Sequence, residues 1–315
     1  MSADSTSSPR LAVAPGPAGQ TAAGRAALDG HARPPRGPWQ LAFGRLRRAK
    51  LAMAGIVILG VLVLLAVFAN VVAPEGQDQQ DLFNIKAPIS AKHWLGTDEL
   101  GRDVVSRLIY GGRVSLAVGL SAALVSTALG IVAGALSGYY GGWVDGALMR
   151  FIDVVLAFPS IFLLLIVFSF DSVGRSATIV SVYLGLFGWM YLARVIRGEF
   201  MALKQREFVE AARAVGAPDG RIIIRHLLPN VIAAIIVATT LSVAYNMLAE
   251  ATLSFLGFGV SPSTPTWGNM LTSARTSALT DPHLVIAPGL VLTVAVLAVN
   301  FIGDGLRDAF DPKGR

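Results

Sequence analysis

Six long stretches of this chain are almost free of charged residues, and they limit its fold more than any other feature. A helix needs about 20 apolar residues to cross roughly 30 Å of bilayer hydrocarbon. The stretches lack the alternation of apolar and polar residues that typifies barrel strands. Because a helix satisfies its backbone hydrogen bonds internally, we predict an all-α polytopic membrane helical bundle. The six predicted transmembrane helices cover about 51–72, 114–139, 154–170, 176–193, 231–249 and 284–302.

The overall composition agrees with a membrane protein. Hydrophobic residues make up 54% of the chain and charged residues only 15%, whereas charged residues are about 25% of a typical soluble domain. The chain has no cysteine, which excludes disulfides, thiolate zinc sites and a thiol nucleophile.

Two regions follow from the distribution of residue types. Residues 1–40 are rich in Ala, Gly, Pro and Ser and show no apolar periodicity, so we expect a disordered tail. Residues 41–315 form the predicted membrane domain. Pro159 is expected to kink the third span, and only five residues separate the third span from the fourth. Small residues of the second span, such as Gly130 and Gly134, suit close helix packing.

Lysine and arginine predict the orientation of the chain. If both termini are cytoplasmic, the inside segments carry 19 of the 26 basic residues, as the positive-inside rule requires. The net charge of +6 is therefore a topology signal, and nucleic-acid binding is not expected. This pattern predicts a multi-pass membrane protein with both termini in the cytoplasm.

The cytoplasmic loop 194–230 is the most informative segment. Apolar residues around Phe208 and Ala212 have helical spacing, and Gly216 followed by Pro218 is a helix stop. A second short helix is expected from Arg221 to Leu227, ending at Pro229 where the fifth span begins. The loop is thus predicted to form a helix–turn–helix elbow. An ordinary amphipathic helix lying on the membrane surface is the alternative.

The elbow combines small residues with charged ones. Ala211 and Ala212 leave room for a close approach, and Glu207, Glu210 and Arg213 offer charges that can be paired. The elbow is therefore a candidate docking site for another protein.

Glu250 interrupts the apolar run of the fifth span, with Asn246 four residues earlier on the same face. An ionisable residue in a membrane segment is a functional hypothesis by default, so both are candidates for a substrate path or gate. Glu250 also lies near the outer boundary, about 30 Å along the helix from Asn230. The alternative is therefore a carboxylate that reaches the headgroups or caps a packed turn.

Residues 103–109 lie before the second span on the outer side. Val104, Val105, Leu108 and Ile109 share one helical face, and Gly111-Gly112 is expected to end this helix. We expect an amphipathic helix on the outer membrane surface. It either packs over the bundle, which we favour, or docks a delivered substrate carrier.

Motifs for catalysis are missing from the sequence. The four histidines are scattered, so no metal cluster is implied, and neither G-x-S-x-G nor H-E-x-x-H occurs. The chain also lacks G-x-x-x-x-G-K-[ST], the loop that cradles nucleotide phosphates. No catalytic residue and no bound cofactor are expected.

Several separated motifs resemble one family of membrane proteins. Glu210-Ala211-Ala212, Gly216 and Leu228-Pro229 resemble the EAA loop of ABC-importer permeases, and Arg225-His226-Leu227-Leu228-Pro229-Asn230 resembles its dipeptide/oligopeptide (nickel) branch. His226 departs from the general pattern, which has Ile at that place. Further matches to the branch are His93-Trp94-Leu95-Gly96-Thr97-Asp98, Gly138-Tyr139-Tyr140-Gly141-Gly142, Glu250-Ala251 with Leu253-Ser254-Phe255-Leu256-Gly257, Thr266-Trp267-Gly268 and Gly303-Asp304. The resemblance covers about residues 43–315.

This resemblance implies a function and a set of partners. The chain would be the second, C-type permease of a type I importer in a bacterial cytoplasmic (inner) membrane, paired with a homologous permease as a heterodimer. Two separate ATPase subunits would bind ATP and Mg, and an extracytoplasmic binding protein would deliver the peptide. The elbow would be the coupling helix against the ATPase, with Glu207, Glu210, Ala211, Ala212, Arg213, Gly216 and Pro229 in that contact.

Two other classes of function fit the sequence less well. A secondary transporter usually has inverted repeats and broken central helices with buried charge, and no clear repeat is visible. A membrane enzyme would need a cluster of catalytic groups at membrane depth, and none is visible. The cargo within the branch, whether dipeptide, oligopeptide, nickel or another ligand, does not follow from the sequence.

Overall fold

The computed structural model describes residues 38–170 and 173–311. The first 37 residues of the predicted tail lie outside this range, and residues 38–40 form the first turn of a helix. Residues 42–311 lie in one folding unit. In chain order, the elements of the described residues are α2 (Pro38–Leu46), α3 (Lys50–Val67), α4 (Ala69–Val72), α5 (Val104–Tyr140), α6 (Gly142–Leu156), α7 (Ser160–Phe168), α8 (Ala177–Leu203), α9 (Glu207–Ala214), α10 (Asp219–Arg221), the π-helix η1 (Ile222–Leu227), α11 (Leu228–Phe255), α12 (Trp267–Ser273), the 3₁₀ turn η2 (Ala274–Ser277) and α13 (His283–Phe310).

Long apolar helices confirm the all-α polytopic membrane bundle. Within the described residues, α3, α5, α8, the run Asp219–Phe255 and α13 are each long and apolar enough to cross a membrane. The sixth candidate is the pair α6 and α7, which is bent by 76°. The described residues therefore hold five unbroken candidates and one broken one.

The bend expected at Pro159 is present, but it is a full break of 76° between two helices, and the candidate span begins at Gly142, ahead of the expected 154. Helix α6 ends at Leu156, and α7 begins only at Ser160. Pro159 lies between them with φ −59° and ψ 122°. Proline has no backbone N–H and forces the residue before it out of the helical region, so the helix breaks here. Each half is too short to span the bilayer alone.

The prediction of a separate surface helix before the second span was wrong. Helix α5 runs without interruption through Gly111 and Gly112, because these glycines face neighbouring chain: a Cβ on Gly112 would lie 3.0 Å from the ring of Trp267. The Asp103 carboxylate caps the helix by accepting the Ser106 N–H at 2.7 Å. Val104 is buried, so the favoured packing role stands.

Helices α5 and α8 form the most extensive contact of the bundle. Gly130, Gly134 and Gly138 recur every four residues along α5 and face α8. A Cβ on Gly134 would lie 2.6 Å from the Ala193 carbonyl oxygen. Only glycine allows the two backbones to approach this closely, as at small-residue interfaces between membrane helices.

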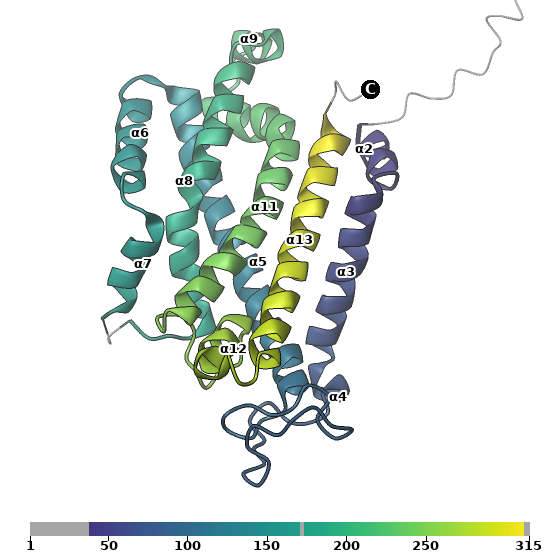
Figure 1. Ribbon diagram of the computed structural model, residues 1–315. Helices are drawn as coiled ribbons and strands as arrows, with labels where there is room; N and C mark the ends of the chain where they lie inside the picture. Colours follow the sequence, from purple (N-terminus) through teal and green to yellow (C-terminus); the bar gives the residue numbers. More distant parts are fainter. Residues whose placement is uncertain (1–37, 171–172, 312–315) are drawn as a thin grey trace, which may run out of the picture. The chain divides into compact units, whose positions relative to one another are not determined.

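The two ends of the bundle differ in structure (Figure 1). Helix α9 lies at one end, which we call the elbow end. The connection between α4 and α5 and the helix α12 lie at the opposite end, which we call the loop end. Helices α5, α8, α11 and α13 connect the two ends.

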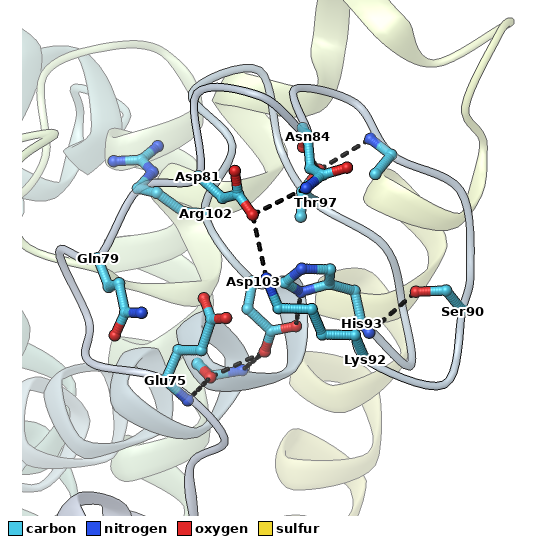
Figure 2. A network of polar contacts seen from close by, with 12 residues as sticks. Glu75, Gln79, Asp81, Asn84, Ser90, Lys92, His93, Thr97, Arg102 and Asp103 are labelled. Atoms are coloured by element: carbon cyan, nitrogen blue, oxygen red, sulfur yellow. Dashed lines mark hydrogen bonds and ion pairs between the residues drawn. The ribbon is translucent and has the colours of Figure 1, made fainter.

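Polar contacts fold the long connection between α4 and α5 (Figure 2). The Asp81 carboxylate accepts from Lys92 Nζ at 3.0 Å and from Asn84 Nδ2 at 2.8 Å. These two partners hold the pKa of Asp81 below its usual value. His93 and Asp103 are both buried, and Nδ1 of the imidazole lies 3.1 Å from the carboxylate. This loop is therefore ordered by its own side chains.

A carboxylate ties this loop to the turn after α12. Glu99 Oε1 accepts from the hydroxyls of Thr276 and Ser277, each at 2.7 Å, and lies 3.2 Å from Lys86 Nζ. The two hydroxyls, and then Lys86, lower the pKa of Glu99. A carboxyl whose pKa is lowered by folding stabilises the fold above its unfolded pKa, and this stability is lost as pH falls through the folded value.

We therefore expect this tie to loosen in acid. A spin label on Leu279→Cys, beside the tie, should become more mobile as pH falls below about 4.3, the ordinary pKa of Glu. In a Glu99→Gln background the label should be mobile already at neutral pH, with a smaller acid response. Equal mobility and equal pH profiles in both backgrounds would show that Glu99 does not secure this turn.

Candidate functional site

Helix α9 forms the outer arm of the elbow and ends in a Schellman motif. The Gly216 N–H donates to the Arg213 carbonyl at 2.9 Å, and the Ala217 N–H donates to the Ala212 carbonyl at 3.0 Å. Gly216 has φ +79°, which is unfavourable for residues with a side chain. The helix stop predicted at Gly216 is therefore present, and it turns the chain back toward the bundle.

The inner face of α9 is fixed to the bundle core. Val209 and Ala212 pack in one buried cluster with Phe200 of α8 and with Ile222 and Leu227 of the returning arm. Ala212 was expected to leave room for a partner, but it is buried against the chain itself. Because apolar contacts join both arms, the elbow can move with α8 and α11 as one body.

The outer face of α9 carries four of the predicted residues. Glu207, Glu210, Ala211 and Arg213 are all exposed, as is Val215 just after the helix, which is 85% exposed. This gives a short ridge with carboxylates at its N-terminal turn, a guanidinium at its last turn and a small residue between them. Such a ridge can enter a groove of another protein and form ion pairs at its rim.

The returning arm of the elbow is continuous with the fifth span. A separate short helix ending at Pro229 was expected, but α10, the π-helix η1 and α11 follow one another without a break. Pro229 is the second residue of α11 and is exposed. A proline is tolerated in the first turn of a helix, and the wider π-turn before it changes the backbone pairing there. The elbow is thus joined to α11 without an intervening loop.

Side-chain contacts that sequence reasoning missed hold the elbow to α5. The Tyr139 hydroxyl donates to Asp219 Oδ1 at 2.5 Å, and the Arg213 guanidinium lies over the Tyr139 ring at 5.5 Å. Nearby, Arg197 Nη2 of α8 donates to Asp145 Oδ2 of α6 at 2.6 Å. In the sequence, Tyr139 is marked only by the motif Gly138-Tyr139-Tyr140-Gly141-Gly142, which resembles the importer branch.

A cavity of about 1210 Å³, which we call the groove, lies beside α8 and α11. Its wall is largely apolar, and its uncharged polar residues are Ser160, Tyr191, Asn230, Ser242 and Tyr245. The Ser160 and Tyr245 hydroxyls are 3.2 Å apart. The charged lining residues are at the elbow end of α8 and α13, namely Glu199, Arg307 and Asp311.

Asn246 and Glu250 do not line this groove. Both are fully buried on α11. Asn246 Nδ2 donates to Ser242 Oγ at 3.1 Å, and its Oδ1 has no hydrogen-bond partner within the described part of the chain. Glu250 accepts from Ser254 Oγ at 2.7 Å and from Ser115 Oγ at 3.3 Å. The structure therefore keeps these two residues near each other but separates them from the elbow.

Comparison with known families accounts for most of the chain. Residues 130–315 match the binding-protein-dependent transport system inner membrane component. Residues 37–88 match the N-terminal TM domain of oligopeptide transport permease C. The first match contains the elbow, the groove and Glu250, and covers more than half of the sequence.

Similar curated proteins extend this agreement. The glutathione transport system permease protein GsiD of Escherichia coli O6:K15:H31 (strain 536 / UPEC) is 40% identical over 279 residues, which is 88% of this chain and 91% of that protein. The proteins of the same name from Shigella boydii serotype 4 (strain Sb227) and Escherichia coli O157:H7 match with the same identity and coverage.

These matches decide between an importer permease, a secondary transporter and a membrane enzyme. A permease of this family is a multi-pass inner-membrane component without enzymatic activity, and ATP is bound by its ATPase partners. A secondary transporter and a membrane enzyme are excluded by this membership. The chain belongs to the binding-protein-dependent transport system inner membrane components, as a C-type permease of an ABC importer in the oligopeptide family.

Proposed function

We propose that this permease moves short peptides, with glutathione-like tripeptides among them, into the cytoplasm. The observation that carries the proposal is the groove of about 1210 Å³, whose wall is largely apolar and carries charged residues only at the elbow end. Ligand pockets of roughly 300–1,000 Å³ hold drug-sized molecules, so a short peptide fits. The 40% identity to permeases named for glutathione transport supports the same class of cargo.

A second, homologous permease completes the path in this proposal. The groove is open on one side of a single chain, so it forms half of a channel. The excess of Lys and Arg in the inside segments supports an orientation with both termini and the elbow in the cytoplasm. An extracytoplasmic binding protein then delivers the peptide at the loop end.

The elbow receives the movement of two ATPase subunits. The exposed ridge of Glu207, Glu210, Ala211 and Arg213 enters the ATPase, while Gly216 shapes the turn and Pro229 begins the attached helix. Because Val209 and Ala212 fix the ridge to α8 and α11, closure of the ATPase pair tilts these helices. Nucleotide thereby shifts the chain between two states by binding one of them more tightly.

Purification of the complete importer tests the partners. The full-length chain, tagged and extracted from its native membrane, should co-purify with a second permease and with ATPase subunits. The absence of any ATPase would contradict the proposal.

Reconstitution tests the cargo. In vesicles, ATP hydrolysis should rise when the binding protein is loaded with glutathione or a dipeptide, and labelled peptide should accumulate inside. Nickel alone serves as the competing cargo. Stimulation by nickel and by no peptide would overturn the peptide assignment while leaving the importer itself intact.

A further inference from the structure

Glu250 is a buried carboxylate without a basic partner in the described part of the chain. It is 0% exposed, and its contacts are hydroxyl groups. Ser254, one turn later on α11, donates to Oε1, and Ser115 of α5 donates to Oε2. Polar groups are seldom buried unless hydrogen bonds satisfy them. These contacts join α5 to α11 near the loop end.

The same network holds α12. The Trp267 N–H donates to Ser115 Oγ at 3.1 Å, which leaves the Ser115 hydroxyl hydrogen free for Glu250. The Trp267 ring donates through Nε1 to the Leu108 carbonyl at 3.0 Å. Gly268 packs so closely on α11 that a Cβ would lie 2.7 Å from Ala251 Cα and from Ser254 Cβ. Helix α12 is thus seated where α5 and α11 meet.

A continuous helix connects this network to the elbow. The run Asp219–Phe255 begins at the elbow and contains Glu250 near its other end. At 1.5 Å per residue, Asp219 and Glu250 are roughly 46 Å apart along this run. Since Glu250 does not line the groove, contact with cargo does not explain the buried carboxyl group.

We propose that Glu250 is a positioning residue, a joint that makes α12 follow the movement of α11. This inference rests on the proposed coupling at the elbow. When the elbow tilts α11, the carboxylate carries Ser115 and Trp267 with it, and α12 moves at the loop end. The loop end then changes in step with the nucleotide state at the elbow end.

The test uses the complete importer and two separate labels. Since the chain has no cysteine, each introduced cysteine is the only one in this chain, and the labelled chain is then assembled with its unlabelled partners. Leu279→Cys, at a 99% exposed position shortly after α12, reports on the loop end, and Val215→Cys, at an 85% exposed position, reports on the elbow. Label mobility is compared without nucleotide and with ATP trapped by vanadate. Both labels should respond in the otherwise unchanged chain.

Glu250→Ala should remove the response at 279 and preserve the response at 215. Ser115→Ala keeps the Glu250 side chain but breaks its link to Trp267, so it should also remove the response at 279. This variant tests the joint if Glu250→Ala does not assemble. Thr252→Val is the matched control, because the Thr252 hydroxyl is on the same helix and donates only to the Leu248 carbonyl. This control should keep both responses.

The outcomes separate this inference from the proposed function. A response at 279 that survives in both Glu250→Ala and Ser115→Ala overturns the joint. Loss of both responses in those variants, with assembly intact, also overturns it, because Glu250 would then act on the elbow itself. A label at 215 that is silent in the unchanged chain contradicts coupling at the elbow instead.

Discussion

Gly216→Val abolishes uptake and leaves the chain inserted in the membrane. Gly216 has φ +79° and nothing lies within 4 Å of the place where a Cβ would go, so the effect is backbone strain and not a clash. The left-handed region costs about 1–2 kcal/mol for an ordinary residue, and a β-branched residue is a genuine outlier there. A penalty of about 2 kcal/mol lowers the equilibrium constant for forming the native elbow roughly 30-fold.

Two matched variants isolate that cause. Gly216→Asn should retain most uptake, because Asn tolerates the left-handed region. Gly220→Val, also in open space but without a positive φ, should have little effect. Uptake, binding-protein-stimulated ATP hydrolysis and the amount of chain in the membrane are measured together. Normal uptake by Gly216→Val would count against the elbow as the coupling element.

Gly134→Leu prevents stable packing of the bundle. A Cβ at Gly134 would lie 2.6 Å from the Ala193 carbonyl oxygen and 2.8 Å from Ile196 Cβ. Extra methylenes in a packed core cost about 1–3 kcal/mol, and a backbone carbonyl cannot rotate away as a side chain does. We therefore expect α5 and α8 to separate and the purified protein to melt at a lower temperature.

Gly146→Leu is the control for this change. Gly146 lies on α6 with nothing within 4 Å of a Cβ, so the same substitution meets open space. Thermal stability in detergent and recovery of the assembled importer are compared for the two variants. If Gly134→Leu is as stable as Gly146→Leu, the close α5–α8 contact does not hold the bundle together.

The sequence by itself determined the features that depend on local chemistry. Charge-free runs of about 20 residues require membrane helices, since backbone groups in lipid must be paired within the segment. Gly216 with Pro218 stops a helix wherever it occurs, and the structure has the stop there. The separated motifs pointed to the importer family, which the comparisons confirm.

Tertiary structure decided the features that depend on neighbours distant in sequence. Gly111-Gly112 has the appearance of a helix end, but Trp267 packs against it and the helix continues. Ala212 seemed available to a partner, but Ile222 and Leu227 are in the same buried cluster. Glu250 could face a substrate or the headgroups, and only the positions of Ser115 and Ser254 reveal a buried network. Sequence spacing determines which residues share a helical face, whereas packing between helices determines which residues that face contacts.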